Sequence, residues 1–163
     1  MATPTTLEQL GNGNPTGCIA PGLHRKIIQS VGATRTLKAN ESGALCLMDR
    51  AAGVVYTLPA PIEGMQFEFI ATVAVTSNAY KIITSAATEF LLGSVIMGDA
   101  TIATSGDVFE ADGTTIRAVS ADGATKGGLI GCRYIVTAIS TTQWSIHGVM
   151  RGTGTLATPF ATS

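Results

Sequence analysis

The sequence predicts an all-β domain, a two-sheet sandwich of the jelly-roll kind with an extended irregular N-terminal arm. Turn-forming Gly, Pro, Asn and Asp recur at short intervals, and no stretch keeps apolar residues at the i, i+3, i+4, i+7 spacing of an amphipathic helix. Many short strands without helical crossovers are typical of a sandwich or a closed barrel, and we favour the sandwich. The length of 163 residues fits one domain.

The first 22 residues are predicted to form the arm, because their frequent Pro and Gly exclude a long helix or a central strand. Only residues 6–10 could form a helical turn, with Thr6 as its N-cap. The sandwich domain is expected over residues 23–163, and it ends in a short tail at about residues 152–163.

The clearest strand spans residues 65–75. Side chains alternate between the two faces of a strand, so the apolar residues at its odd positions share one face and are predicted to be core. These residues are Met65, Phe67, Phe69, Ala71, Val73 and Val75. Gln66, Glu68 and Thr72 lie on the opposite face, which is predicted to be solvated near the start of the strand.

A second clear strand covers residues 143–147, where Trp144 and Ile146 alternate with polar residues and are predicted to point inward. Two Asp-Gly pairs, at 112–113 and 122–123, predict tight turns, because Gly tolerates a positive φ. The other expected strands are shorter. They cover residues 26–31, 35–38, 44–48, 54–58, 81–84, 90–92, 101–103, 115–119 and 133–139.

The chain is poor in charge. Asp, Glu, Lys and Arg make up 13% of the sequence, against roughly 25% in ordinary soluble domains, and mean hydropathy is positive at +0.34. Such a chain must expose apolar side chains, and contiguous apolar patches are usually partner surfaces. The composition therefore favours an assembly subunit; the alternative is a monomer with a surface rich in Thr, Ser and Gly.

The charge pattern and the lack of targeting signals exclude several classes of partner and location. The net charge is −1, and the single compact basic cluster, His24-Arg25-Lys26, is too small to neutralise a string of phosphates. Neither direct nucleic-acid binding nor export nor membrane insertion is expected. The widely spaced Cys18, Cys46 and Cys132 predict no disulfide framework or metal knuckle, and Cys46 is expected in the core.

No residue pattern supports catalysis or a cofactor. The chain offers His24 and His147 as its two histidines, and it has no GxSxG nucleophile motif. Asp107, Glu110 and Asp112 could suggest calcium, but they do not match an EF-hand loop and are interpreted as solvated carboxylates at a turn. We expect a non-enzymatic protein without catalytic residues, cofactor or metal.

Five segments carry a resemblance to a known group of proteins. They are residues 35–47 (RTLKANESGALCL), 49–61 (DRAAGVVYTLPAP), 64–69 (GMQFEF), 143–146 (QWSI) and 152–160 (GTGTLATPF). This pattern resembles virion proteins of tailed bacteriophages and, within that group, head decoration (cement) proteins.

The resemblance implies a protein on the outer surface of the capsid, synthesised in the bacterial cytoplasm, that binds the major capsid protein lattice and stabilises the expanded head. It also implies self-association as a dimer or a trimer. An alternative is a tail- or fibre-associated β-sandwich module whose loops, rich in Thr and Ser, bind host glycans. A third alternative, a small virion hydrolase, would need His147 as a base.

Apolar residues in the two terminal segments are the expected contact points with a partner, because these segments cannot build a core of their own. They are Leu7, Leu10, Ile19 and Leu23 in the arm, and Leu156 and Phe160 in the tail. The alternative is that these side chains fold back onto their own domain.

Overall fold

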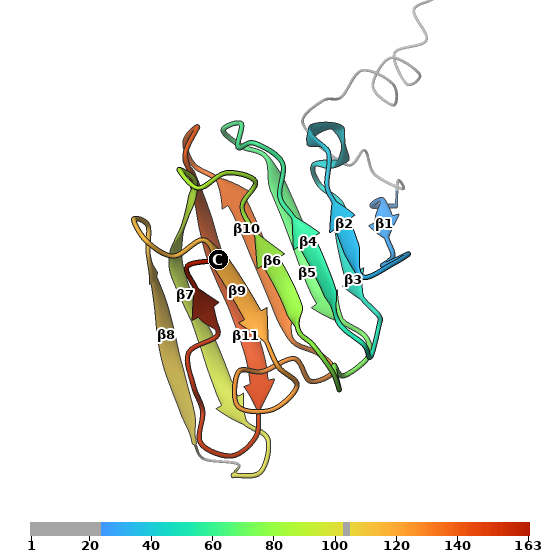
Figure 1. Ribbon diagram of the computed structural model, residues 1–163, viewed down its shortest axis with the longest axis vertical. Helices are drawn as coiled ribbons and strands as arrows, with labels where there is room; N and C mark the ends of the chain where they lie inside the picture. Colours follow the sequence, from blue (N-terminus) through green and yellow to red (C-terminus); the bar gives the residue numbers. More distant parts are fainter. Residues whose placement is uncertain (1–23, 103–104) are drawn as a thin grey trace, which may run out of the picture.

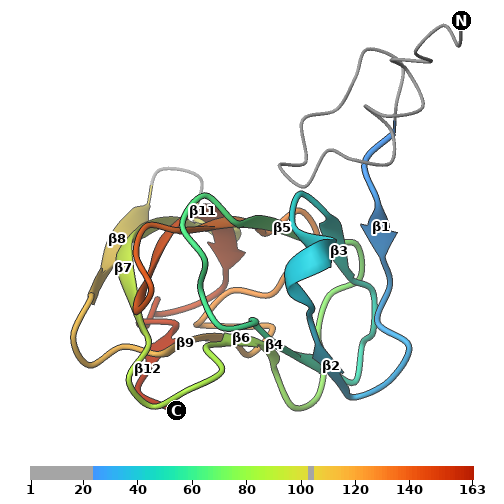
Figure 2. The same ribbon diagram turned by 90° about the horizontal axis from the view of Figure 1, so that it is seen from above.

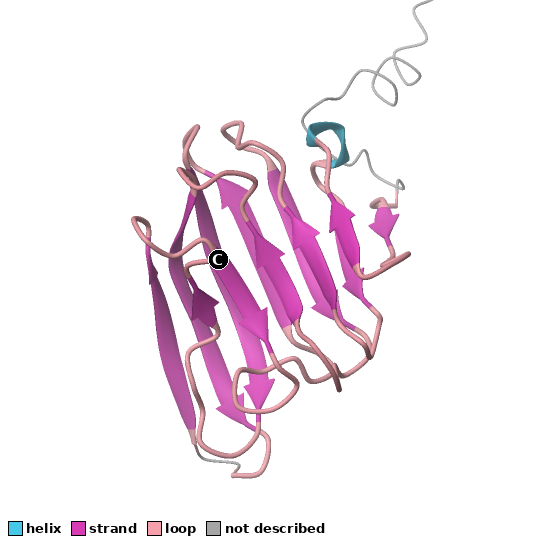
Figure 3. Cartoon of the chain, viewed as in Figure 1, coloured by secondary structure: helices cyan, strands magenta, loops and turns pink. Residues whose placement is uncertain are grey.

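The computed structural model describes residues 24–102 and 105–163, and these form two β-sheets packed face to face (Figures 1 and 2). The predicted two-sheet sandwich is confirmed. The expected arm at residues 1–22, including the helical turn at residues 6–10, lies outside the described residues. Strands account for nearly all of the regular structure, as the secondary-structure colouring in Figure 3 shows.

One sheet has seven strands and the other has five. In spatial order, the seven-stranded sheet contains β1 (Ile27–Ile28), β3 (Leu45–Met48), β5 (Gln66–Ala71), β10 (Arg133–Ala138), β11 (Gln143–Gly152), β7 (Phe90–Asp99) and β8 (Gly106–Asp112). The five-stranded sheet contains β12 (Phe160–Ala161), β9 (Ala118–Ala121), β6 (Tyr80–Ile83), β4 (Val54–Thr57) and β2 (Thr34–Thr36). A 3-10 helix, η1 (Ala39–Glu41), joins β2 to β3.

The first half of the chain winds between the two sheets. Strands β1, β3 and β5 belong to one sheet, and β2, β4 and β6 belong to the other, so the chain passes from one sheet to the other after every strand. Sequence-alternate strands therefore become parallel neighbours, as in the pairs β3–β5 and β4–β6. The second half contains the antiparallel hairpins β7–β8 and β10–β11.

This winding bears on the jelly-roll prediction. Jelly rolls are antiparallel architectures, whereas β1–β3, β3–β5, β2–β4, β4–β6 and β7–β11 are parallel pairs. The sandwich prediction holds, but its jelly-roll connectivity is not confirmed. Side-chain alternation reports which face a residue occupies and carries no information on the direction of the neighbouring strand, so the sequence could not reveal these pairs.

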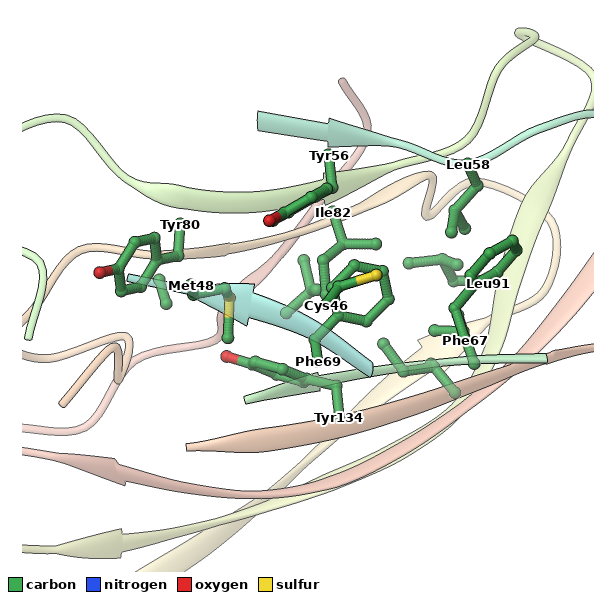
Figure 4. Packing of buried hydrophobic residues seen from close by; sticks show 14 of the residues in the cluster. Cys46, Met48, Tyr56, Leu58, Phe67, Phe69, Tyr80, Ile82, Leu91 and Tyr134 are labelled. Carbon is green, nitrogen blue, oxygen red and sulfur yellow. The ribbon is translucent and has the colours of Figure 1, made fainter. Parts of the chain in front are cut away.

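The core lies between the two sheets, and aromatic side chains from both of them fill it (Figure 4). Tyr56 from β4 meets Phe69 from β5 edge to face, with ring centroids 5.4 Å apart. Phe67 packs against Trp144, with ring centroids 6.1 Å apart. The predicted inward positions of Phe67, Phe69, Trp144 and Cys46 are confirmed, since each is fully buried. Edge-to-face aromatic pairs add to the stabilisation that burial alone provides.

Several strand boundaries differ from the prediction. The strand expected to run to residue 75 ends at Ala71, and Glu68 is buried rather than solvated. Residues 101–102 lie in a bend instead of a strand. The sequence prediction missed β8 and β12, because the acidic residues of β8 were assigned to a turn and β12 has two residues.

The two Asp-Gly turns are confirmed, and the aspartates hold them together. The Asp112 carboxylate accepts hydrogen bonds from the backbone N–H groups of Thr114, Thr115 and Ile116, at 2.9, 2.8 and 3.1 Å. A further hydrogen bond from the Thr115 hydroxyl contributes most to lowering the pKa of Asp112. Asp122 accepts in the same way from Ala124 and Lys126. These are Asx turns, in which the aspartate side chain accepts hydrogen bonds from backbone N–H groups a few residues further along the chain.

Gly93 lies at a point where two backbones come close together. It occupies β7 opposite Ile146, with φ at 134°, and a Cβ at this position would lie 2.1 Å from the Ile146 carbonyl oxygen. We predict that Gly93→Ala lowers the free energy of unfolding by at least about 2 kcal/mol, because the strand pair must separate. Gly98→Ala in the same strand should change it by less than about 1 kcal/mol, since a Cβ there meets no atom within 4 Å. Urea unfolding curves of both variants test this, and equal midpoints would contradict it.

Candidate interaction surface

The outer face of the seven-stranded sheet carries apolar side chains on all seven of its strands. Strand alternation sends one set into the core and the other set outward, and both sets are apolar over much of this sheet. We call the outward set the outer apolar face. It comprises Ile27, Leu45, Leu47, Ile70, Leu92, Ile96, Val108, Ile135 and Val149.

One row of this face crosses six adjacent strands. Strand register places its members directly beside one another, from β3 to β8: Leu47, Ile70, Arg133, Val149, Ile96 and Val108. Five strand spacings cover about 24 Å. Ile96 is 56% exposed, Val108 60% and Val149 61%, so the row is open to contact at the β8 side.

Arg133 and Glu68 interrupt the apolar face with a compact ion cluster. The Glu68 carboxylate accepts from the guanidinium groups of Arg25 and Arg133, and Arg25 also donates to the Gly43 carbonyl at 2.9 Å. Burial alone would raise the pKa of Glu68, but the hydrogen bonds and charges of the two arginines outweigh it and hold that pKa below its usual value. The two cations thus explain why Glu68 is 5% exposed on a face predicted to be wet.

A second ion cluster lies beside the first one. Glu41 of η1 accepts from Lys26 Nζ at 3.0 Å and from Arg35 Nη2 at 2.7 Å, and its second oxygen accepts from the Lys38 backbone N–H at 2.9 Å. Burial opposes ionisation of Glu41, but these hydrogen bonds and charges prevail and lower its pKa. Together, Glu68 and Glu41 fix residues 25 and 26, where the described part of the chain begins.

The predicted tail contacts lie within the domain. Phe160 is 8% exposed and belongs to β12, which pairs with β9, and Leu156 is half-buried against the core. Both side chains therefore fold back onto their own domain, as the second interpretation of the sequence allowed. Leu7, Leu10, Ile19 and Leu23 lie outside the described residues, so their role as contacts stays a prediction.

The sequence analysis missed the exposed residues of the outer apolar face. Leu92 and Ile96 were not separable from core residues by pattern, because the neighbouring Leu91, Val95 and Met97 are also apolar. Strand alternation shows that two apolar sets exist. It does not show which of them another layer covers.

The sheet also brings a serine and a carboxylate near His147, which is exposed on the outer face. Register places Ser94 beside His147, and Glu110 beside Ser94. A hydrolytic triad needs the histidine between serine and acid, whereas here the serine occupies the middle position. No hydrogen bond joins these three side chains in the part of the chain that the structure describes.

Metal-ligand clusters and membrane-spanning helices are both absent from the described residues. In residues 24–102 and 105–163, no group of three or more His, Cys, Asp or Glu side chains is arranged to hold a metal ion. No helix in those same ranges is long and apolar enough to cross a membrane.

Comparison with models of protein families, with curated proteins and with solved structures finds no match to this chain.

The Glu68 cluster predicts a pH-dependent contribution to stability. Because its folded pKa is lowered, the stabilisation is fully present above about pH 4.3, the ordinary pKa of a glutamate, and is lost as the pH falls through the folded value. Glu68→Gln should lower the free energy of unfolding by about 1–2 kcal/mol at pH 7, a value kept modest because Arg133 is half-exposed. The difference from the unmodified chain should shrink at pH 3.

Urea unfolding at both pH values measures this effect. The matched control is Glu63→Gln, at an exposed turn position, which should leave stability unchanged at either pH. A Glu68→Gln deficit that is the same at pH 3 and pH 7 would show that the carboxylate charge is not responsible.

Proposed function

We propose that this chain is a non-enzymatic assembly subunit that binds its partner through the outer apolar face. The observation that carries the proposal is the row from Leu47 to Val108, which crosses six strands and has no covering layer among the described residues. In keeping with the resemblance of residues 35–69 and 143–160 to phage virion proteins, the partner we propose is the major capsid protein, and the role is that of a head decoration protein.

A sheet face is suited to this task because it is already rigid. Its backbone is held by neighbouring strands on both sides, so binding requires little additional ordering of the chain. Each exposed Ile or Val that becomes buried can contribute on the order of 1 kcal/mol. Polar groups at the margin, such as Gln66 and Thr137, which are joined by a 3.0 Å hydrogen bond, can form the solvated rim of such an interface.

Capsid stabilisation then follows from mass action. An expanded head presents the same site many times, and a subunit that binds only the assembled lattice shifts the equilibrium toward it. Contacts between decoration subunits raise their effective concentration, so that each single contact can be modest.

Negative charge placed in the exposed apolar part of the row should weaken binding. We expect Ile96→Glu/Val149→Glu to weaken binding to purified expanded capsids by at least about tenfold, because two carboxylates would need to be desolvated at the interface. The control is Ile62→Glu, which is 60% exposed in the β4–β5 turn and should bind normally. Co-sedimentation with capsids measures occupancy, and a melting curve verifies that each variant folds.

The outcome also discriminates the alternative function. If the double variant occupies capsids as fully as the unmodified chain does, the outer apolar face is not the binding surface. Absence of capsid binding together with hits on a host glycan array would support the tail- or fibre-associated module instead. Imaging of intact particles that carry the chain would distinguish a head from a tail location.

Deletion of residues 1–22 tests the expected contacts at Leu7, Leu10 and Ile19. We expect reduced capsid occupancy with an unchanged melting temperature, because the deletion ends before the ion clusters that begin at Arg25. Occupancy equal to that of the full chain would refute a binding role for this segment. Substitution of Leu7, Leu10 and Ile19 by Ser in the full chain tests the same contacts without changing the length of the chain.

A further inference from the structure

Charge is segregated along the chain. Residues 24–50 hold five Lys or Arg against two acidic residues, a net charge of +3, whereas residues 90–116 hold four acidic residues and no Lys or Arg, a net charge of −4. The whole chain is nearly neutral, with a net charge of −1. Its low overall charge therefore conceals two segments of opposite sign.

The fold places these segments at opposite ends of the sandwich. β1, β2 and η1 lie together at one end, and β8 forms the other (Figure 2). We call the first the basic end, defined by Arg25, Lys26, Arg35 and Lys38. We call the second the acidic end, defined by Asp107, Glu110 and Asp112 of β8, all three exposed.

The basic end keeps a positive charge in spite of its internal ion pairs. Lys26 and Arg35 share the single carboxylate of Glu41, and Arg25 shares Glu68 with Arg133. Lys38 is exposed beside them. Cations therefore exceed carboxylates at the surface of this end.

The acidic end offers an open strand edge. β8 is the last strand in its sheet, so no described strand pairs with its outer side. The hydrogen bonds from Asp99 N to Ser105 O and from Gly113 N to Leu91 O show that the odd-numbered residues of β8 bond to β7. In an antiparallel pair the alternate residues, here Gly106, Val108 and Glu110, direct their N–H and C=O groups outward. Such an edge is a template for another chain.

Charge determines which surface of a second copy of the chain can bind the β8 edge. Pairing β8 with β8 of a second copy would bring Asp107, Glu110 and Asp112 close to the same carboxylates of that copy, which like-charge repulsion disfavours. The basic end of a second copy presents the complementary charge.

We propose that copies of this chain associate head to tail, with the acidic β8 edge of one copy against the basic end of the next. This contact is heterologous, so it does not produce a twofold dimer and instead closes into a ring, such as a trimer, or continues as a chain. It uses the ends of the sandwich and leaves the part of the outer apolar face on β3, β5, β10, β11 and β7 free, so it stands whether or not that face binds a capsid.

Light scattering of the purified full chain at increasing concentration tests the proposal. We expect a mass of three or more subunits at low salt, with association weakened by about tenfold between 0.05 and 0.5 M NaCl because the charges are screened. Asp107→Lys/Glu110→Lys should weaken association at low salt by a similar factor, and its residual association should rise with salt, since salt now screens a repulsion. Lys26→Gln/Lys38→Gln should weaken association without this reversal.

Glu63→Lys, at an exposed turn away from both ends, is the matched control and should behave as the unmodified chain. A monomer at all concentrations, a twofold dimer, or an oligomer insensitive to salt and to the β8 substitutions would each overturn the proposal. The reversed salt dependence protects the test against misfolding, because a β8 variant that merely lost its structure would not recover association as salt increases.

Discussion

The packing of two apolar sheet faces against each other is the constraint on which the rest of the structure depends. From β1 to β6 the chain passes from one sheet to the other after every strand, so successive strands contribute side chains to the core from opposite sides. The contact between Tyr56 and Phe69 shows the result, since it joins a strand of one sheet to a strand of the other. Cys46 and Cys132 are free thiols buried in this core.

A two-layer sandwich covers one face of each sheet and leaves the other face outside. In most antiparallel sandwiches the outer face is polar. Here Val149 of β11 and Ile96 of β7 remain more than half exposed, although each lies in a strand that has a neighbouring strand on both sides. The ion cluster on Glu68 is polar but buried, because two arginines from distant parts of the chain bind its carboxylate and shield it from solvent. The outer face thus combines exposed apolar side chains on β11, β7 and β8 with a fixed ion cluster on the central strands β5 and β10.

The sequence was sufficient for the sheets and insufficient for their arrangement. Period-two alternation identified the inward positions of β5 and β11, including Phe67, Phe69 and Trp144. It could not identify parallel neighbours, because strand direction leaves no mark in the pattern. β8 was missed since Asp107 and Glu110 are typical of turns, and burial of Glu68 was missed since its partners come from elsewhere in the chain. For the interaction surface, the pattern identified apolar residues, and the fold alone determined which of them remain uncovered.

The distribution of charge links the composition to the proposed assembly. A protein with 13% charged residues could spread them evenly over its surface and remain soluble as a monomer. This chain instead concentrates cations near β1 and carboxylates on β8. Charges at the two ends give direction to contacts between copies, while exposed apolar side chains such as Val149 and Ile96 supply surface whose burial stabilises a complex. These requirements act on different parts of the same sheet, so a single rigid face can meet a partner while its ends meet identical neighbours.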